Sequence, residues 1–154
     1  MTERAPPGAL DVPDRSQQFR GSALARGVLR LLGWKLKFNG LPSKQGVMVV
    51  YPHTSNWDLI IGLLAKWGMG FPAKFWIKDS SLRVPVLGPL LRALGGIAVV
   101  RSQTSGVVSD MAAQFDRARD TDQYLWLVLA PEGTRSYKPA WKSGFYHVAL
   151  KAGV

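Results

Sequence analysis

The stretch GVMVVYPHTSNWDLIIGLLAK, residues 46–66, determines how this chain is expected to fold. Its first part, residues 46–51, is short, apolar and rich in β-branched side chains without alternation, which is typical of a strand buried on both faces. Pro52 ends this strand, and Ser55 or Asn56 can cap a helix that runs from about Trp57 to Lys66. A strand, a polar loop and a helix in this order form the first half of a βαβ unit.

The rest of the chain repeats this alternation. Further strands are predicted over residues 75–78, 97–100 and 124–129, and helices over about 86–94, 105–119 and 143–151, the first of these helices interrupted by Gly88-Pro89. Strands that alternate with helices predict an α/β fold with a largely parallel sheet flanked by helices. The length of 154 residues and the hydrophobic content of 47% suit one domain, which we place at residues 38–154.

Two segments precede this domain. Residues 1–17 contain prolines and charges but almost no large apolar side chain, so we expect a flexible tail. Residues 18–37 carry apolar side chains at roughly helical spacing together with arginines and lysines, which predicts an N-terminal amphipathic helix. Such a helix either lies in a membrane interface with its cations at the phosphate level or packs on its own domain with a solvated basic face. The sequence leaves both alternatives open.

Composition limits the classes of function. Lys and Arg number 20 against 10 Asp and Glu, and the net charge of +10 indicates an anionic partner such as nucleic acid, an anionic membrane or a phosphorylated small molecule. The absence of cysteine excludes thiol nucleophiles and zinc–thiolate sites. No apolar run suits a transmembrane helix and no secretory signal is evident, so we expect the protein to face the cytoplasm. The tryptophans lie mostly in apolar runs rather than along a basic stripe, which argues against nucleic acid.

The loop after the first strand contains a histidine and an aspartate five residues apart, His53 and Asp58. If the aspartate carboxylate meets the imidazole Nδ1, it fixes the tautomer and leaves Nε2 as a general base that can activate a hydroxyl. The alternative is that Asp58 only complements the helix dipole and His53 is an ordinary loop residue. No Gly-x-Ser-x-Gly elbow and no cysteine is present to form an acyl-enzyme, so a base here would act on a hydroxyl of the substrate itself.

Two further polar clusters follow buried strands, which is where open α/β sheets place ligands. Arg101 comes after the third predicted strand and is well placed to grip a phosphate, although an ordinary salt bridge is the simpler explanation. The loop Pro131-Glu-Gly-Thr-Arg-Ser136 follows the fourth strand. It offers the carboxylate of Glu132, the flexible backbone of Gly133, the cation of Arg135 and the hydroxyls of Thr134 and Ser136. A turn capped by a carboxylate is the alternative explanation for this loop.

Together these clusters resemble a known family. The His-x4-Asp pair, the Gly-Gly-Ile stretch that ends at Arg101 and the Pro-Glu-Gly-Thr-Arg-Ser loop are similar, in order and spacing, to the first three blocks of the glycerolipid acyltransferases, the lysophosphatidic acid (1-acylglycerol-3-phosphate) acyltransferase superfamily. The likeness covers about residues 38–154. The segment Trp141-Lys-Ser-Gly-Phe-Tyr-His147 also resembles the segment after the third block in bacterial members.

This resemblance implies a glycerol-3-phosphate acyltransferase-like fold and a definite reaction. His53, held by Asp58, would take the proton of an acceptor hydroxyl as it attacks the thioester of acyl-CoA or acyl-carrier protein. The phosphate and glycerol of a lysophospholipid would be bound by the residues of the other two blocks, namely Arg101, Glu132, Gly133, Thr134, Arg135 and Ser136. The expected product from 1-acylglycerol-3-phosphate is phosphatidic acid, made by a peripheral protein on the cytoplasmic face of an anionic membrane without a metal or redox cofactor.

The chain departs from the family pattern in two respects. Val100 and Ala98 stand where members usually carry an acidic residue and a bulky or proline residue before the second-block arginine, which leaves the acceptor open to other lysophospholipids, glycolipids or aminolipids. The chain also stops at Val154, where the family continues into a strand with a proline-bearing fourth block, so we expect a fragment or a truncated product. A non-catalytic basic module that docks on a membrane is the alternative from another class of function.

Overall fold

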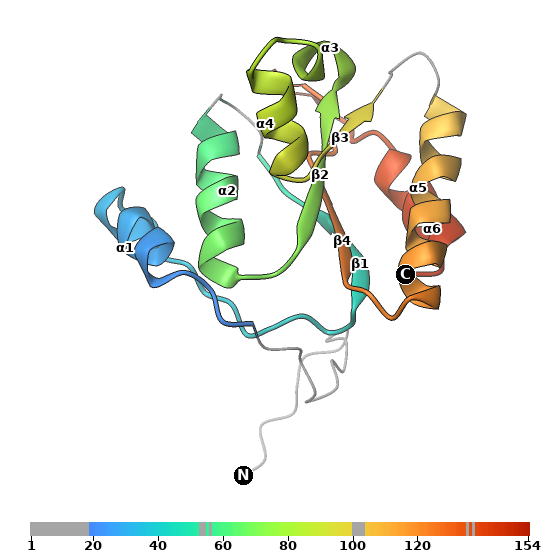
Figure 1. Ribbon diagram of the computed structural model, residues 1–154. Helices are drawn as coiled ribbons and strands as arrows, with labels where there is room; N and C mark the ends of the chain where they lie inside the picture. Colours follow the sequence, from blue (N-terminus) through green and yellow to red (C-terminus); the bar gives the residue numbers. More distant parts are fainter. Residues whose placement is uncertain (1–18, 53–54, 56, 100–103, 135, 137) are drawn as a thin grey trace.

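A four-stranded parallel sheet forms the centre of the molecule (Figure 1). The computed structural model describes residues 19–52, 55, 57–99, 104–134, 136 and 138–154. The strand order is β1-β4-β2-β3, and the strands are β1 (Gln45–Val49), β2 (Ala73–Lys78), β3 (Gly96–Val99) and β4 (Leu125–Leu129). The prediction of an α/β fold with a parallel sheet flanked by helices is therefore confirmed.

Helices cover both faces of this sheet. In Figure 1, α2 (Trp57–Met69) and α4 (Leu87–Ala93) lie on one side, and α5 (Thr104–Asp120) and α6 (Gly144–Ala152) lie on the other. A short helix, α3 (Asp79–Leu82), follows β2 directly and was not predicted from the sequence. The helix α1 (Ala23–Leu31) packs beside α2, outside the two layers that sandwich the sheet.

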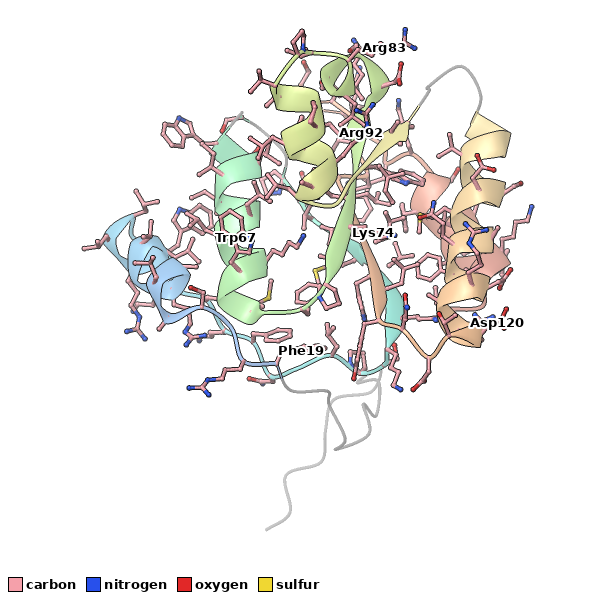
Figure 2. All side chains as sticks on the ribbon, in the orientation of Figure 1. Phe19, Trp67, Lys74, Arg83, Arg92 and Asp120 are labelled. Atoms are coloured by element: carbon pink, nitrogen blue, oxygen red, sulfur yellow. The ribbon has the colours of Figure 1, made fainter. Side chains whose placement is uncertain are left out.

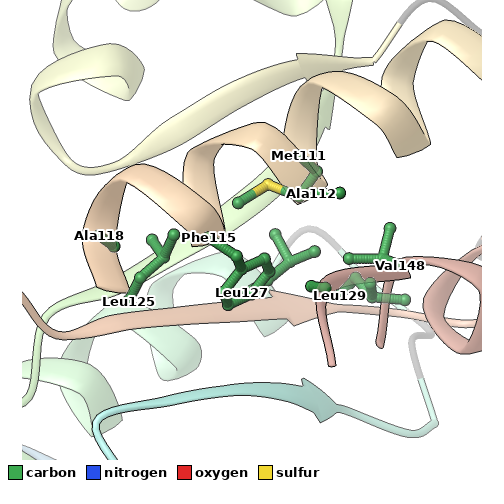
Figure 3. Close-up of a cluster of buried hydrophobic side chains, with 9 residues drawn as sticks. Met111, Ala112, Phe115, Ala118, Leu125, Leu127, Leu129 and Val148 are labelled. Carbon is green, nitrogen blue, oxygen red and sulfur yellow. The ribbon is translucent and has the colours of Figure 1, made fainter. Parts of the chain in front are cut away.

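The main core lies between the sheet and the pair α5 and α6. Phe115 of α5, Leu127 of β4 and Val148 of α6 are each 0% exposed and lie at the centre of one buried cluster (Figure 3). Because β4 sits between β1 and β2, its apolar side chains are buried on both faces of the sheet, as its continuous Leu-Trp-Leu-Val-Leu sequence requires.

An aromatic cluster closes the edge of the sheet at which the strands begin. The ring of Phe19, near the lower end of the molecule in Figure 2, lies 6.4 Å from that of Phe71 and 5.1 Å from that of Tyr124. The indole of Trp126 lies over Gly46 of the neighbouring strand, where an added Cβ would be 2.6 Å from the ring. These rings cover the starts of the strands, and a cavity of about 520 Å³ lies beside Phe71, lined by residues of α1 and α2.

The N-terminal helix is shorter than the predicted segment 18–37. Ser22 caps it by accepting from the backbone N–H of Ala25. It ends at Gly33, whose φ of 83° is left-handed and whose N–H donates to the carbonyl of Arg30, while the Trp34 N–H donates to that of Leu29. This hydrogen-bond pattern is the Schellman motif, which satisfies the last carbonyls and turns the chain away.

The apolar side chains of α1 form one buried line and one exposed line. Ala25 and Leu29 are buried, whereas Leu24 and Leu31 are 79% and 89% exposed. The helix therefore packs on its own domain along one line of side chains and leaves a second apolar line without cover. The expected tail at residues 1–17 lies outside the described residues, and no helix in the described part of the chain is long and apolar enough to cross a membrane.

The predicted break in the helix at residues 86–94 is wrong. Gly88 and Pro89 both lie inside α4, because they occupy its first turn, where a proline removes no helical hydrogen bond. Gly88 is needed there, since a Cβ would lie 2.1 Å from the carbonyl oxygen of Leu82.

At the other end of α4, the Lys66 ammonium of α2 donates to the Leu94 carbonyl at 2.6 Å, and burial lowers the pKa of Lys66 below its ordinary 10.5.

Candidate active site

The polar clusters follow three of the four parallel strands. Because the strands are parallel, their carboxyl ends meet at one edge of the sheet, the upper edge in Figure 1. The loops after β1 and β4 leave from neighbouring strands, and the backbone N–H of Val50 still donates to the carbonyl of Leu129 at 3.0 Å. β3, which precedes Arg101, lies at the far side of β2. The connections after β1 and β4 therefore leave the sheet from adjacent positions.

Asp58 lies in the first turn of α2, as expected. Its Oδ2 accepts from the backbone N–H of Ser55 at 2.7 Å, and the Ser55 hydroxyl accepts from the backbone N–H of Trp57 at 3.0 Å. These bonds hold the carboxylate against the backbone of Ser55 and also complement the helix N-terminus. His53, Arg101 and Arg135 lie outside the described residues, so their roles stay predictions.

The loop after β4 holds a buried carboxylate. Glu132 is 5% exposed, and it alone is charged among the buried side chains of the described residues. Gly133 has a φ of 63° and donates its N–H to the carbonyl of Ala130, so this position needs the conformational freedom of glycine. Thr134 is half-buried and its hydroxyl accepts from the N–H of the exposed Ser136 at 3.3 Å. Charged side chains are almost never fully buried unless they are paired, so the buried Glu132 makes this loop a candidate site.

A cavity of about 1520 Å³ opens at this edge of the sheet. Apolar side chains from both layers of helices line it, including Leu59 of α2, Leu91 of α4 and Phe145 of α6. Gly133, Thr134 and Lys142 form part of its wall. The indole Nε1 of Trp76, which also lines it, is buried and has no acceptor among the described groups. The cavity is large enough for a lipid-sized ligand and offers it both an apolar interior and polar groups.

The comparisons with known proteins give one match. A family model described as Acyltransferase matches residues 35–154. The chain belongs to this family. The resemblance to glycerolipid acyltransferases is thereby confirmed, and with it the assignment of acyltransferase activity. No curated protein and no solved structure matches the chain.

The cations in the described lining of this acyltransferase's cavity were missed as individual site residues. They are Lys78 at the end of β2, Lys142 before α6 and Lys151 near its end. None of the described lining residues is an aspartate or a glutamate. The only sequence signal was for Lys142, which falls in the segment after the third block; nothing in the order of residues shows that Lys78 and Lys151 face the same cavity.

Proposed function

We propose that this acyltransferase moves a fatty acyl group from acyl-CoA or acyl-carrier protein to the hydroxyl of a lysophospholipid, with 1-acylglycerol-3-phosphate as the acceptor and phosphatidic acid as the product. One observation carries the proposal. A large apolar cavity whose described lining holds lysines and no carboxylate lies beside the Glu132–Ser136 loop, in a chain of the Acyltransferase family. An apolar space with a cationic rim suits a ligand that joins a fatty chain to a phosphate.

In the proposed reaction, Nε2 of His53 accepts the proton of the acceptor hydroxyl. The hydroxyl oxygen bonds to the thioester carbonyl carbon, the carbon–sulfur bond breaks, and the proton passes to the departing thiolate. Asp58 acts as a positioning residue for the imidazole. Its observed hydrogen bond from Ser55 supports this role because it restrains the carboxylate in the same turn.

The acceptor's phosphate and glycerol are assigned to Arg101, Glu132, Gly133, Thr134, Arg135 and Ser136. The half-buried Thr134 and the left-handed Gly133 support the assignment, since both line the cavity. The buried Glu132 precedes them in the same loop, and we assign to it the orientation of the loop or of a hydroxyl of the acceptor.

We further propose that the protein binds the cytoplasmic face of an anionic membrane as a peripheral protein. Large apolar side chains are exposed on α1 and just after it, at Leu24, Leu31, Leu32 and Trp34. Exposed cations accompany them, at Arg20, Arg30, Lys35 and Lys37. An uncovered apolar line flanked by arginines and lysines is typical of helices that lie at the level of lipid headgroups.

Acyl transfer from labelled acyl-CoA to 1-acylglycerol-3-phosphate tests the reaction. His53→Ala and Asp58→Asn should each lower the rate by at least about 10²-fold. Asp79→Asn is a matched control, because Asp79 also lies in the first turn of a helix but pairs with Arg83 and is not part of the cavity lining. A rate that is unchanged in both His53→Ala and Asp58→Asn would overturn the mechanism.

Flotation with vesicles that contain anionic lipid tests the membrane face. The double variant Leu24→Glu, Leu31→Glu should lose binding, since both side chains are almost fully exposed and their replacement leaves the core intact. Tyr146→Glu, which changes a 55% exposed side chain on α6, should float like the parent protein. Equal loss in both proteins, or retention of the double variant, would place the membrane face elsewhere.

A further inference from the structure

Lys142 contacts the Glu132–Ser136 loop through its backbone and through its side chain. Its backbone N–H donates to the Pro131 carbonyl at 2.9 Å. Its side chain lies across Gly133, where an added Cβ would be 3.2 Å from Cδ, 3.2 Å from Nζ and 3.3 Å from Cε. The end of the lysine thus lies over Gly133, and the residue is exposed at the rim of the cavity.

The surroundings of this ammonium favour an anion. Lys142 takes part in none of the ion pairs between described residues, which are Lys44–Asp122, Arg83–Asp79 and Arg119–Asp116. The cavity wall beside it includes Thr134 and Ser143. Ser143 occupies the N-cap position of α6 but makes no capping bond with its side chain. Two hydroxyls and an ammonium without a described carboxylate partner form a set of donors suited to a phosphate.

The strand order also favours Lys142 over Arg101 as a ligand of the acceptor's phosphate. Lys142 lies on the connection that leaves β4, and β4 is the direct neighbour of β1, from which the His53 loop leaves. β3, which precedes Arg101, is three strand spacings from β1, or about 14 Å at ~4.8 Å per strand. A small headgroup whose hydroxyl is at His53 is therefore closer to the connection after β4 than to the connection after β3.

We propose that Lys142 binds the phosphate of the acceptor and makes the enzyme select phosphorylated acceptors. This inference rests on the proposed function. Gly133 is the positioning residue for this lysine, because a Cβ at that position would shift the end of the lysine by a few tenths of an ångström.

Two measurements on Lys142→Gln test the proposal. The first compares kcat/KM for 1-acylglycerol-3-phosphate with kcat/KM for the unphosphorylated 1-monoacylglycerol. The second titrates the protein calorimetrically with sn-glycerol 3-phosphate, which reports binding without catalysis. Loss of one charged hydrogen bond should lower kcat/KM about 10- to 100-fold with the phosphorylated acceptor only, and weaken glycerol 3-phosphate binding by a similar factor.

Three further variants make the result specific. Lys138→Gln removes the same charge from the same connection. Lys138 is exposed like Lys142 but does not line the cavity, so binding and selectivity should be unchanged. Lys142→Arg should keep most of the preference for phosphate. Gly133→Ala should weaken glycerol 3-phosphate binding less than Lys142→Gln does, because its Cβ shifts the end of the lysine by only a few tenths of an ångström.

The outcomes separate the two proposals. If the parent protein binds glycerol 3-phosphate through Lys142 but acylates no lysophospholipid, the proposed function is wrong and the phosphate site stands. If the parent protein acylates lysophospholipids while Lys142→Gln binds and selects like the parent, the role of Lys142 is overturned. It is also overturned if the parent protein binds no glycerol 3-phosphate, or if Lys138→Gln has the same effect as Lys142→Gln.

Discussion

Replacement of Gly21 by alanine should detach the start of α1 from α2. A Cβ on Gly21 would lie 1.8 Å from the carbonyl oxygen of Gly68 and 2.4 Å from its carbonyl carbon. Both atoms belong to backbone, so no side-chain rotation can relieve the overlap. Gly21 is not in the left-handed region, which means that the substitution tests close approach alone and not backbone strain.

The cost depends on the contacts that the displacement breaks. Two hydrogen bonds join the segments at this point, from the Ser22 N–H to the Trp67 carbonyl at 2.8 Å and from Arg26 Nη1 to the Gly68 carbonyl at 2.9 Å. Each contributes about 0.5–1.5 kcal/mol, and overpacking of a tight contact costs about 1–3 kcal/mol. We therefore expect a loss of about 2–6 kcal/mol in the free energy of unfolding.

The matched control is Gly27→Ala, at a glycine inside α1. No atom lies within 4 Å of a Cβ on Gly27, so this variant should gain ~1 kcal/mol from helix propensity. Urea unfolding followed by far-UV circular dichroism gives both values, and the midpoints should move in opposite directions. A Gly21→Ala protein as stable as the parent would refute the observed contact between α1 and α2.

Three other changes should alter stability in defined ways. Phe115→Ala empties the centre of the main core and should cost about 3–5 kcal/mol in urea unfolding. Val86→Gly should stabilise the protein by ~1 kcal/mol. Val86 is a β-branched residue at φ 66°, in a strained γ-turn in which the Leu87 N–H donates to the Pro85 carbonyl. Its side chain is 83% exposed, so its removal costs little burial. Burial lowers the pKa of Lys66 in the folded chain, so the unfolded chain binds more protons between that lowered pKa and 10.5, and the free energy of unfolding should rise with pH there. Lys66→Met should lack this rise; identical pH profiles of the two proteins would contradict it.

Local patterns were sufficient to predict most elements of this fold. The strand starting near residue 46, the helix at Trp57 and the strand that ends at Leu129 were identified because apolar periodicity and capping residues act over a few positions. The strand order β1-β4-β2-β3 was not predicted, because it depends on which apolar surfaces meet in three dimensions. The same holds for the contact between Gly21 and Gly68, whose close approach leaves no mark in the neighbouring sequence.

The candidate site was also predicted only in part, because some of its residues come together through the topology. Asp58 and the Glu132–Ser136 loop were predicted as site residues from motif spacing, and the strands that precede them, β1 and β4, are neighbours in the sheet. Lys78 and Lys151 were not found, since residues more than seventy positions apart face one cavity only once the sheet has formed. Spacing therefore identifies groups within one loop, whereas the electrostatic character of the cavity depends on the topology.

The helices α2 and α4 present apolar side chains in two directions. Leu59 and Leu91 line the cavity, whereas their neighbours Ile60 and Leu90 are 45% and 52% exposed on the outside. Leu87 does both, since it lines the cavity and is 43% exposed. The two helices lie on the same face of the sheet as α1, whose uncovered apolar line we assign to the membrane (Figure 1). A lysophospholipid that entered between α2 and α4 would keep its acyl chain against the apolar side chains of these two helices. Its phosphate would then contact the lysines at the carboxyl ends of the strands.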